Sequence, residues 1–181
     1  MRALTLRVLS GLRVCPSLGD NRGMKTRILF VCMGNICRSP AAEAVFIDRI
    51  TAQGVEHLFH VDSAGTGGWH AGSSADTRSI AEGKERGYHL PSRARQVNSE
   101  DWTAFDVIVC MDIENHANLI DMGAPEENVR LLLEWHPTQS GEDVPDPYYG
   151  GDDGFVHMYD LIELAVDGLV ADLIPGSDEM K

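Results

Sequence analysis

Cysteine is scarce in this chain of 181 residues, which contains only Cys15, Cys32, Cys37 and Cys110. Four cysteines do not form the dense framework that cross-links small secreted domains, so we expect reduced thiols and a cytoplasmic location. Basic residues are also few: 15 lysines and arginines stand against 28 aspartates and glutamates, which gives a net charge of −13. Because nucleic acids and anionic membranes both attract a basic surface, this charge argues against either as a partner.

Long apolar runs are absent as well. No stretch of the sequence approaches the roughly 20 continuous apolar residues that cross a bilayer. Hydrophobic residues make up 43% of the chain and charged residues 24%, both close to ordinary globular usage. A chain of this length buries roughly 70% of its unfolded surface, which suits one core and leaves little room for a second. We therefore expect one domain and a monomer.

The N-terminal stretch differs from the rest of the chain. Residues 1–23 carry four arginines against one aspartate, a net charge of +3. Two interpretations are open: an arginine-rich targeting segment, or a tail that an early start codon places before Met24. The tail is favoured, since hydroxyl residues are few and amphipathic order is weak. The expected boundaries are an extension at 1–23, a domain at 24–175 and a C-terminal tail at 176–181.

Short apolar runs alternate with segments of helical periodicity from Ile28 onward. Buried strands are expected at 28–31, 57–61, 107–111 and 129–133. Helices are expected at 39–50, 74–87, around 98–101, 112–121 and 155–173, with Ser39, Asn98 and Asp112 as N-caps. This alternation predicts an α/β domain of three layers, in which helices flank a four-stranded parallel sheet and a phosphate loop follows the first strand.

The loop between Cys32 and Pro40 follows the first strand, at the sheet edge where open α/β folds bind their ligands. Gly34 and Asn35 tolerate left-handed backbone geometry, so successive N–H groups can turn inward and bind an anion. The next helix adds free N–H groups at its N-terminus, and Arg38 supplies a planar fork for two phosphate oxygens. Cys32 lies in this positive field, which favours its thiolate form. The pattern indicates a phosphate site with a cysteine nucleophile rather than a buried thiol or a metal site.

The spacing Cys-x5-Arg-Ser in a strand-to-helix turn resembles the low-molecular-weight protein-tyrosine phosphatase family. Further similar segments follow in the right order, at 41–46, 62–66, 94–97, 110–112 and 146–150. Together they extend over residues 26–173. The resemblance implies hydrolysis of protein phosphotyrosine through a phosphocysteine intermediate, with no metal and no other cofactor.

The resemblance also implies a role for each matching residue. Cys32 would attack phosphorus, Arg38 would hold the phosphate, and Asp146 would act first as general acid and then as base. The phosphate-binding loop would contain Met33, Gly34, Asn35, Ile36, Cys37 and Ser39, and the substrate pocket would have Trp69, Tyr148 and Tyr149 at its mouth. Ser39 would also stabilise the Cys32 sulfur as a leaving group. The expected partner is a tyrosine-phosphorylated protein or a small aryl phosphate.

Two points stay open at this stage. Cys37 is either a redox partner that protects Cys32 through a reversible disulfide or a packed thiol. Some members of the family have a histidine that braces the loop, at a position where this chain has Ser92. The sequence therefore does not say which group braces the loop.

Three other functions are compatible with the same scaffold. The related arsenate reductases pass a disulfide to further cysteines, whereas only Cys110 lies downstream here, in a predicted buried strand. Protein-arginine phosphatases of the family carry a threonine where this chain has Ile36, and an apolar side chain better suits an aryl phosphate. A non-catalytic phosphate-binding module would not need the nucleophile, the arginine and the acid that are all present. Phosphotyrosine hydrolysis is therefore favoured.

Overall fold

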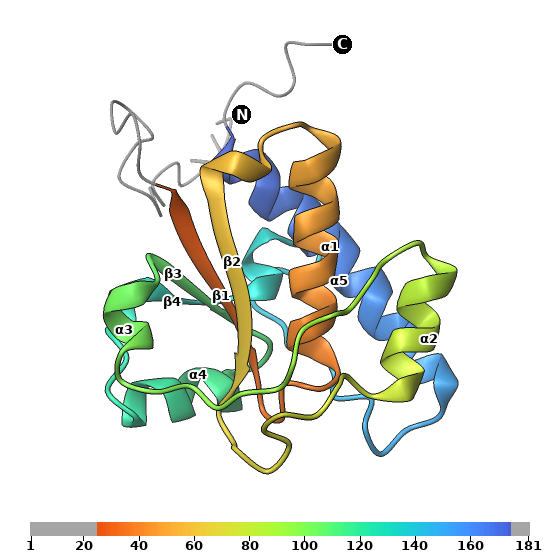
Figure 1. Cartoon of the computed structure of the whole chain (residues 1–181), viewed down its shortest axis with the longest axis horizontal. Coiled ribbons are helices and arrows are strands. Elements are labelled where there is room, and N and C mark those ends of the chain that lie inside the picture. The colour runs from red at the N-terminus through yellow and green to blue at the C-terminus, as the bar shows by residue number, and fades with distance from the viewer. Residues whose placement is uncertain (1–24, 175–181) are drawn as a thin grey trace, which may run out of the picture.

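Residues 25–174 are described by the computed structural model; the expected extension and the C-terminal tail lie outside them. Four strands form one parallel sheet in the order β2-β1-β3-β4. They are β1 (Thr26–Cys32), β2 (Phe59–Gly65), β3 (Val107–Cys110) and β4 (Val129–Leu131). The predicted α/β class and the four parallel strands are confirmed (Figure 1).

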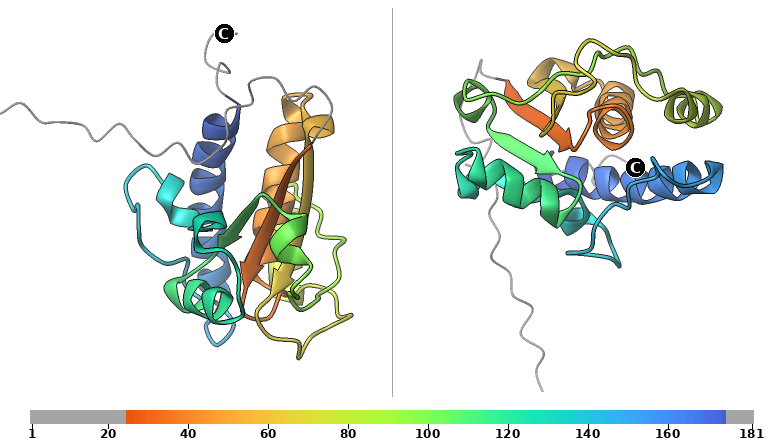
Figure 2. Two further views of the ribbon diagram at one scale, coloured as in Figure 1. Left: turned by 90° about the vertical axis from the view of Figure 1, so that its left-hand side faces the viewer. Right: turned by 90° about the horizontal axis from the view of Figure 1, so that it is seen from below.

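Helices cover both faces of the sheet, which confirms the three layers (Figure 2). On one face lie α1 (Arg38–Ala52) and α5 (Asp152–Leu173), with α2 (Thr77–Glu85) packed beside them. The other face carries α3 (Asp101–Ala104) and α4 (Ile113–Asp121). Three short 3₁₀ helices complete the set: η1 (Glu56–Leu58), η2 (Glu126–Asn128) and η3 (Leu132–Trp135). None of the helices in the described part of the chain is long and apolar enough to cross a membrane.

The central strand β1 serves two separate cores. Side chains alternate between the two faces of a strand. Ile28 and Phe30 accordingly pack with α1 and α5, while Leu29 and Val31 pack on the face that carries α4. All four are fully buried, so the continuous apolar run in the sequence reports a strand that is covered on both sides.

The strand boundaries differ from the prediction by one or two residues in most places, and β2 runs on to Gly65, past the expected end at Val61. The second strand was expected from His57, but His57 and Leu58 belong to η1 and the strand begins at Phe59. The fourth strand was expected to reach Leu133, but it ends at Leu131, and Leu132 and the following residues form η3. In the second place an apolar segment packs into the core as a single helical turn, with Leu132 and Leu133 fully buried, and periodicity cannot distinguish this from a short strand. In the first place the turn is exposed: none of the residues of η1 is buried, and only Phe59 begins the core-facing strand.

The helix caps give a mixed result. Asp112 caps α4 as predicted, because its side chain accepts a hydrogen bond from Asn115 N. Asn98 is not the N-cap of α3, which is Glu100, although Asn98 Oδ1 accepts a hydrogen bond from Glu100 N. Ser39 was also wrong as a cap: α1 begins one residue earlier, after Cys37. Its hydroxyl instead takes part in the site described below.

The last long helix approaches its neighbours closely at Gly168. A Cβ atom at this position would lie 2.2 Å from the carbonyl oxygen of Trp135 in η3. Alanine normally stabilises a helix by about 1 kcal/mol relative to glycine, but here the backbone must shift, and overpacking costs roughly 1–3 kcal/mol. We therefore expect Gly168→Ala to lower the free energy of unfolding by about 1–2 kcal/mol in urea titrations.

Gly154, in the first turn of the same helix, is the matched control. A Cβ atom there would meet Pro147 at 3.4 Å, an ordinary contact. We expect Gly154→Ala to leave the free energy of unfolding unchanged or slightly higher. Equal losses in the two variants would contradict the assignment of the effect to the contact with Trp135.

Candidate active site

The loop after β1 wraps around the sulfur of Cys32. Asn35 has a φ of +53°, the only positive φ among the non-glycine residues that the structure describes, and asparagine tolerates this conformation. The turn directs the Asn35 N–H toward Cys32 Sγ at 3.3 Å. At the end of the neighbouring strand, a Cβ atom on Gly65 would lie 2.7 Å from Met33 O. A glycine at that position therefore makes room for the loop.

The side chain of Asn35 holds the loop in place through three hydrogen bonds. Its Nδ2 donates hydrogen bonds to Ser39 Oγ and to Ser63 Oγ, both at 2.9 Å. Its Oδ1 accepts a hydrogen bond from Arg95 N at 2.9 Å. Ser39 Oγ in turn lies 3.1 Å from Cys32 Sγ. Ser39 Oγ accepts from Asn35, and Ala64 O, at 3.2 Å, and the sulfur both lie within reach of its single proton.

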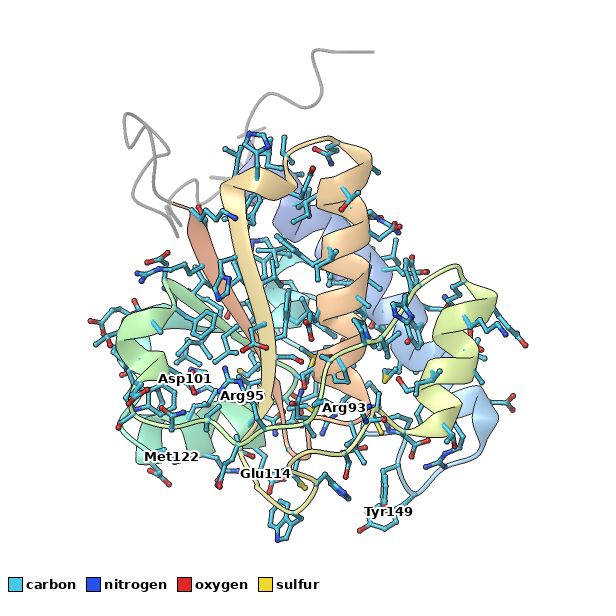
Figure 3. The ribbon with its side chains drawn as sticks, viewed as in Figure 1. Arg93, Arg95, Asp101, Glu114, Met122 and Tyr149 are labelled. Carbon is cyan, nitrogen blue, oxygen red and sulfur yellow. The ribbon has the colours of Figure 1, made fainter. Side chains whose placement is uncertain are left out.

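Arg95 is held in place by two carboxylates. Its Nε donates to Asp62 Oδ2 at 3.0 Å, and its Nη1 lies 3.0 Å from Asp101 Oδ2. The pair of Arg95 and Asp101 lies toward the loop end of the strands (Figure 3). These ion pairs hold Arg95 in place, and with it the backbone N–H that donates to Asn35 Oδ1.

The group at the far end of this chain of hydrogen bonds is Glu43. Both amide protons of Asn35 are already donated, so the proton of Ser63 points to Glu43 Oε2 at 2.6 Å. Ser92 also hydrogen-bonds the Glu43 carboxyl. The open question of what braces the loop therefore has an answer for this chain: Ser63, Glu43 and Ser92 hold Asn35 in place. Sequence analysis missed this role, although Glu43 follows Ser39 by four residues on one helix face.

A prediction follows for Glu43. We expect Glu43→Ala to lower kcat about tenfold, because the Ser63 hydroxyl loses its acceptor and an unmade buried hydrogen bond costs roughly 1–3 kcal/mol. Glu43→Gln keeps an acceptor oxygen, so it is expected to lose less. Steady-state kinetics on both variants tests this order, and an unchanged kcat in Glu43→Ala would exclude a bracing role.

The same carboxyl should influence stability in a pH-dependent way. Burial raises the pKa of Glu43, although hydrogen bonds from Ser63 and Ser92 oppose the shift. A carboxyl whose pKa is raised on folding contributes stability at low pH, and this contribution is lost as pH rises through the folded pKa. Unfolding titrations from acid to neutral pH should therefore show Glu43→Gln gaining stability relative to wild type as pH increases.

Arg38 lies almost fully buried behind the loop, with 2% of its surface exposed. Its Nη1 donates to Asp112 Oδ2 at 2.5 Å and to Val144 O at 3.1 Å, and its Nη2 donates to Asp146 Oδ2 at 2.6 Å. Burial works to lower the pKa of the guanidinium, but the negative charges of Cys32, Asp146 and Asp112 outweigh it and raise the pKa. The arginine is therefore a permanent positive charge at the bottom of the site.

Asp112 has a second role beyond the predicted cap. One carboxylate oxygen caps α4, and the other accepts the hydrogen bond from Arg38. It follows β3 directly, at the same sheet edge as Cys32. A carboxylate at the carboxyl end of a parallel strand is a signal that sequence analysis could have used.

One pocket of about 450 Å³ unites most of the predicted site residues. Its lining consists of Cys32, Met33, Gly34, Ile36, Cys37, Arg38, Trp69, His70, Asp146, Tyr148 and Tyr149. Of the predicted residues, only Asn35 and Ser39 do not line it; they lie buried beneath the loop. His70 was not predicted, and its ring lies 6.4 Å from that of Tyr148. Three aromatic side chains at the mouth are exposed: Trp69, Tyr148 and Tyr149. Tyr149 is almost fully exposed and projects from the lower end of the molecule in Figure 3.

Cys37 lines the same pocket as Cys32 and is buried. Burial raises its pKa, and the negative charge of Asp76 adds to the effect. Cys37 is therefore a neutral thiol at physiological pH, in contrast to a thiolate nucleophile. Cys32, Cys37 and Cys110 are all free thiols in the structure.

Comparisons with known proteins agree with this geometry. A family model described as low molecular weight phosphotyrosine protein phosphatase matches residues 27–176. A low molecular weight protein-tyrosine-phosphatase of Streptomyces coelicolor is 46% identical over 154 residues, which cover 82% of this chain and 93% of the relative. Low molecular weight protein-tyrosine phosphatase A of Mycobacterium tuberculosis is 41% identical, over 78% of this chain and 88% of the relative.

Solved structures show the same likeness. A protein tyrosine phosphatase from Entamoeba histolytica is similar with a TM-score of 0.79 and 41% identity, over 82% of this chain and 97% of that one. A Drosophila arginine phosphatase is similar with a TM-score of 0.76 and 28% identity, over 83% of this chain and 99% of that one. Sequence and structure thus agree that the chain belongs to the low molecular weight phosphotyrosine protein phosphatase family and is a protein-tyrosine phosphatase.

Proposed function

We propose that this protein hydrolyses phosphotyrosine in proteins through a phosphocysteine intermediate on Cys32, with Arg38 as the phosphate clamp and Asp146 as general acid and base. The observation that carries the proposal is the convergence of these three groups in one pocket. Transfer of a phosphoryl group to sulfur requires three parts: a nucleophilic thiol, a cation and an acid. Here Cys32 Sγ accepts a hydrogen bond from a loop N–H, Arg38 is buried, and the Asp146 carboxylate is half-exposed.

In the first step, the thiolate of Cys32 attacks phosphorus while the bond from phosphorus to the tyrosine oxygen breaks. The N–H groups of the loop and Arg38 bind the other three phosphate oxygens. Asp146 gives its proton to the leaving oxygen. Arg38 Nη2 donates to Asp146 Oδ2, so the arriving phosphate competes for that donor and releases the carboxyl to face the leaving group.

In the second step, water attacks the phosphocysteine. Asp146, now ionised, takes a proton from the water, and the bond between phosphorus and sulfur breaks to release phosphate. Ser39 Oγ, 3.1 Å from Cys32 Sγ, donates its proton toward the sulfur and stabilises the departing thiolate. The hydroxyl is fully buried, and a turn of its O–H bond away from Ala64 O, the acceptor at 3.2 Å, brings the proton to the sulfur.

The walls of the pocket support an aryl phosphate over the alternatives. Ile36 gives the loop an apolar side chain, and Tyr148 packs edge to face with Tyr149 at 5.0 Å. An arsenate reductase would need a relay cysteine, but Cys110 is fully buried, burial raises its pKa, and its Sγ donates to Arg130 O. These observations favour phosphotyrosine over both phosphoarginine and arsenate.

Cys37 is proposed as a redox partner of Cys32. A peroxide would oxidise the Cys32 thiolate to a sulfenic acid, and the Cys37 thiol would condense with it to give a disulfide and water. The position of both cysteines along the same pocket supports this step. The free thiols also favour a reducing compartment such as the cytoplasm.

Turnover of three substrates in the presence of a chelator tests the proposal. We expect metal-independent hydrolysis of a phosphotyrosine peptide, at a kcat/KM at least about tenfold above that for a phosphoarginine peptide, with no arsenate reduction. Turnover of only phosphoarginine or arsenate would keep the fold and change the function. Tight phosphate binding without turnover of any substrate would indicate a binding module.

A further inference from the structure

A second groove, of about 300 Å³, adjoins the active-site pocket. The two hollows share Met33 and Trp69. The far wall of the second groove comes from α4 and its C-terminal end, with Glu114, Asn118, Asp121 and Met122. The groove is therefore a continuation of the pocket along one side of the phosphate loop.

Apolar side chains in this groove are unusually exposed. Met33 is 38% exposed, Met122 40% and Trp69 76%. Large apolar side chains gathered at the rim of a pocket mark contact surfaces for other molecules. Methionine adapts to partners of different shapes, and tryptophan supplies a large rigid face. An extended polypeptide could bury all three.

The polar side of the groove is acidic. Glu114, Asn118 and Asp121 are spaced by four and three residues on α4 and so lie on one face of the helix. Both carboxylates are exposed, and neither has an ion-pair partner among residues 25–174. No lysine or arginine lines the groove. The electrostatic complement of this surface is a positive charge.

The second groove lies beside the mouth of the first pocket, with which it shares Met33 and Trp69. Glu114 and Met122 lie at the same end of the molecule as Tyr149, which stands at the other side of the active-site mouth (Figure 3). A phosphotyrosine in the first pocket therefore leaves its flanking residues close to the second groove. Neighbouring residues of an extended chain are about 3.5 Å apart, so positions within a few residues of the phosphotyrosine can reach it.

We propose that this groove binds the substrate polypeptide beside the phosphotyrosine and favours a segment that carries a lysine or arginine next to an apolar side chain. The apolar side chain packs on Met33, Trp69 and Met122, and the cation lies between Glu114 and Asp121. This inference rests on the proposed function and adds a substrate preference to it. The negative groove and the positive phosphate loop then recognise two different parts of one substrate.

Peptide kinetics test this proposal. Phosphotyrosine peptides carry a single arginine at each position from three before to three after the phosphotyrosine, and each is compared with the same peptide bearing glutamine. Every kcat/KM is divided by that of the same enzyme for free phosphotyrosine, so changes in folding or chemistry cancel. At low salt we expect the arginine peptide to be preferred about fivefold at one or two positions, a size typical of an exposed ion pair.

The double variant Glu114→Gln/Asp121→Asn is expected to bring this preference down to about one. Glu126→Gln/Glu127→Gln is the matched control, because it removes the same charge from exposed side chains in η2, which precedes β4 at the opposite end of the sheet. The control should keep the preference, which separates a local groove from the general attraction of an acidic protein.

Several outcomes would overturn the proposal. Equal turnover of arginine and glutamine peptides at every position would refute the groove while leaving the proposed function intact. The same holds if the preference survives in Glu114→Gln/Asp121→Asn, or falls equally in the control. A preference that depends on enzyme concentration would point to a second copy of the chain in the groove. Absence of turnover for every phosphotyrosine peptide would refute the proposed function together with the groove.

Discussion

Cys32→Ser is expected to lower kcat for phosphotyrosine hydrolysis by about 10⁴-fold or more, the size of loss seen when a covalent nucleophile is removed. The hydroxyl that replaces the thiol stays protonated at neutral pH and is a far weaker nucleophile than a thiolate. Its oxygen still meets Ser39 Oγ and Asn35 N, which contact the sulfur in the native chain. The variant should therefore fold and bind phosphate while losing the chemistry.

Rapid acid quenching with a labelled substrate measures this effect directly. Wild type should show label on the protein during turnover, whereas Cys32→Ser should show none. Cys110→Ala is the control, since that thiol is fully buried in β3, away from the pocket lining. Label retained on Cys32→Ser, or lost equally in Cys110→Ala, would exclude Cys32 as the attacking group.

Asp146→Asn is expected to lower kcat for a phosphotyrosine peptide by about 10²–10³-fold, within the range for general acid catalysis. The amide cannot protonate the tyrosine oxygen, whose conjugate acid has a pKa of about 10. A substrate with a more acidic phenol needs less protonation, so its kcat should fall much less. The loss should therefore grow steadily with the pKa of the leaving phenol.

A series of aryl phosphates that differ in phenol pKa provides the measurement. Asp112→Asn is the informative comparison, because Asp112 contacts the same Arg38 as Asp146 does. Loss of this contact should weaken phosphate binding and raise KM, with no dependence on the leaving group. If Asp112→Asn shows the steeper dependence, the acid is Asp112 and the assignment of Asp146 is wrong.

Local patterns predicted the elements that depend on nearby residues. The run Ile28 to Val31 identified a strand buried on both faces, and Asp112 identified the start of α4. Ser39 misled for a physical reason: its hydroxyl suits a helix cap, but Cys32 and Asn35 compete for it, and the tertiary contact wins. A preference of about 1 kcal/mol for a cap is easily overridden by a buried network.

The same difference separates the residues of the candidate site that the sequence predicted from those that it did not. Cys32 and Arg38 stand at the two ends of one short loop, so their spacing in the sequence already indicated a phosphate site. The hydrogen bond between Ser63 and Glu43 joins a strand to a helix, across 20 positions of the sequence. Hydrophobic periodicity gives no sign of such a contact. The place of His70 in the pocket could not be predicted for the same reason, because only the folded loop brings it beside Tyr148.

The contact between Arg38 and Asp146 joins residues that are 108 positions apart, and this separation has a consequence during synthesis. During translation Cys32 and Arg38 are synthesised early, whereas Asp146 follows only after most of the chain has been made. The helix α5, which packs against α1 and fills the core, follows later still. An unfinished chain therefore contains the proposed nucleophile without the proposed proton donor and without the packing of α5 against α1. We therefore expect activity only on a nearly complete polypeptide, and a shortened chain that ends before Asp146 should be inactive.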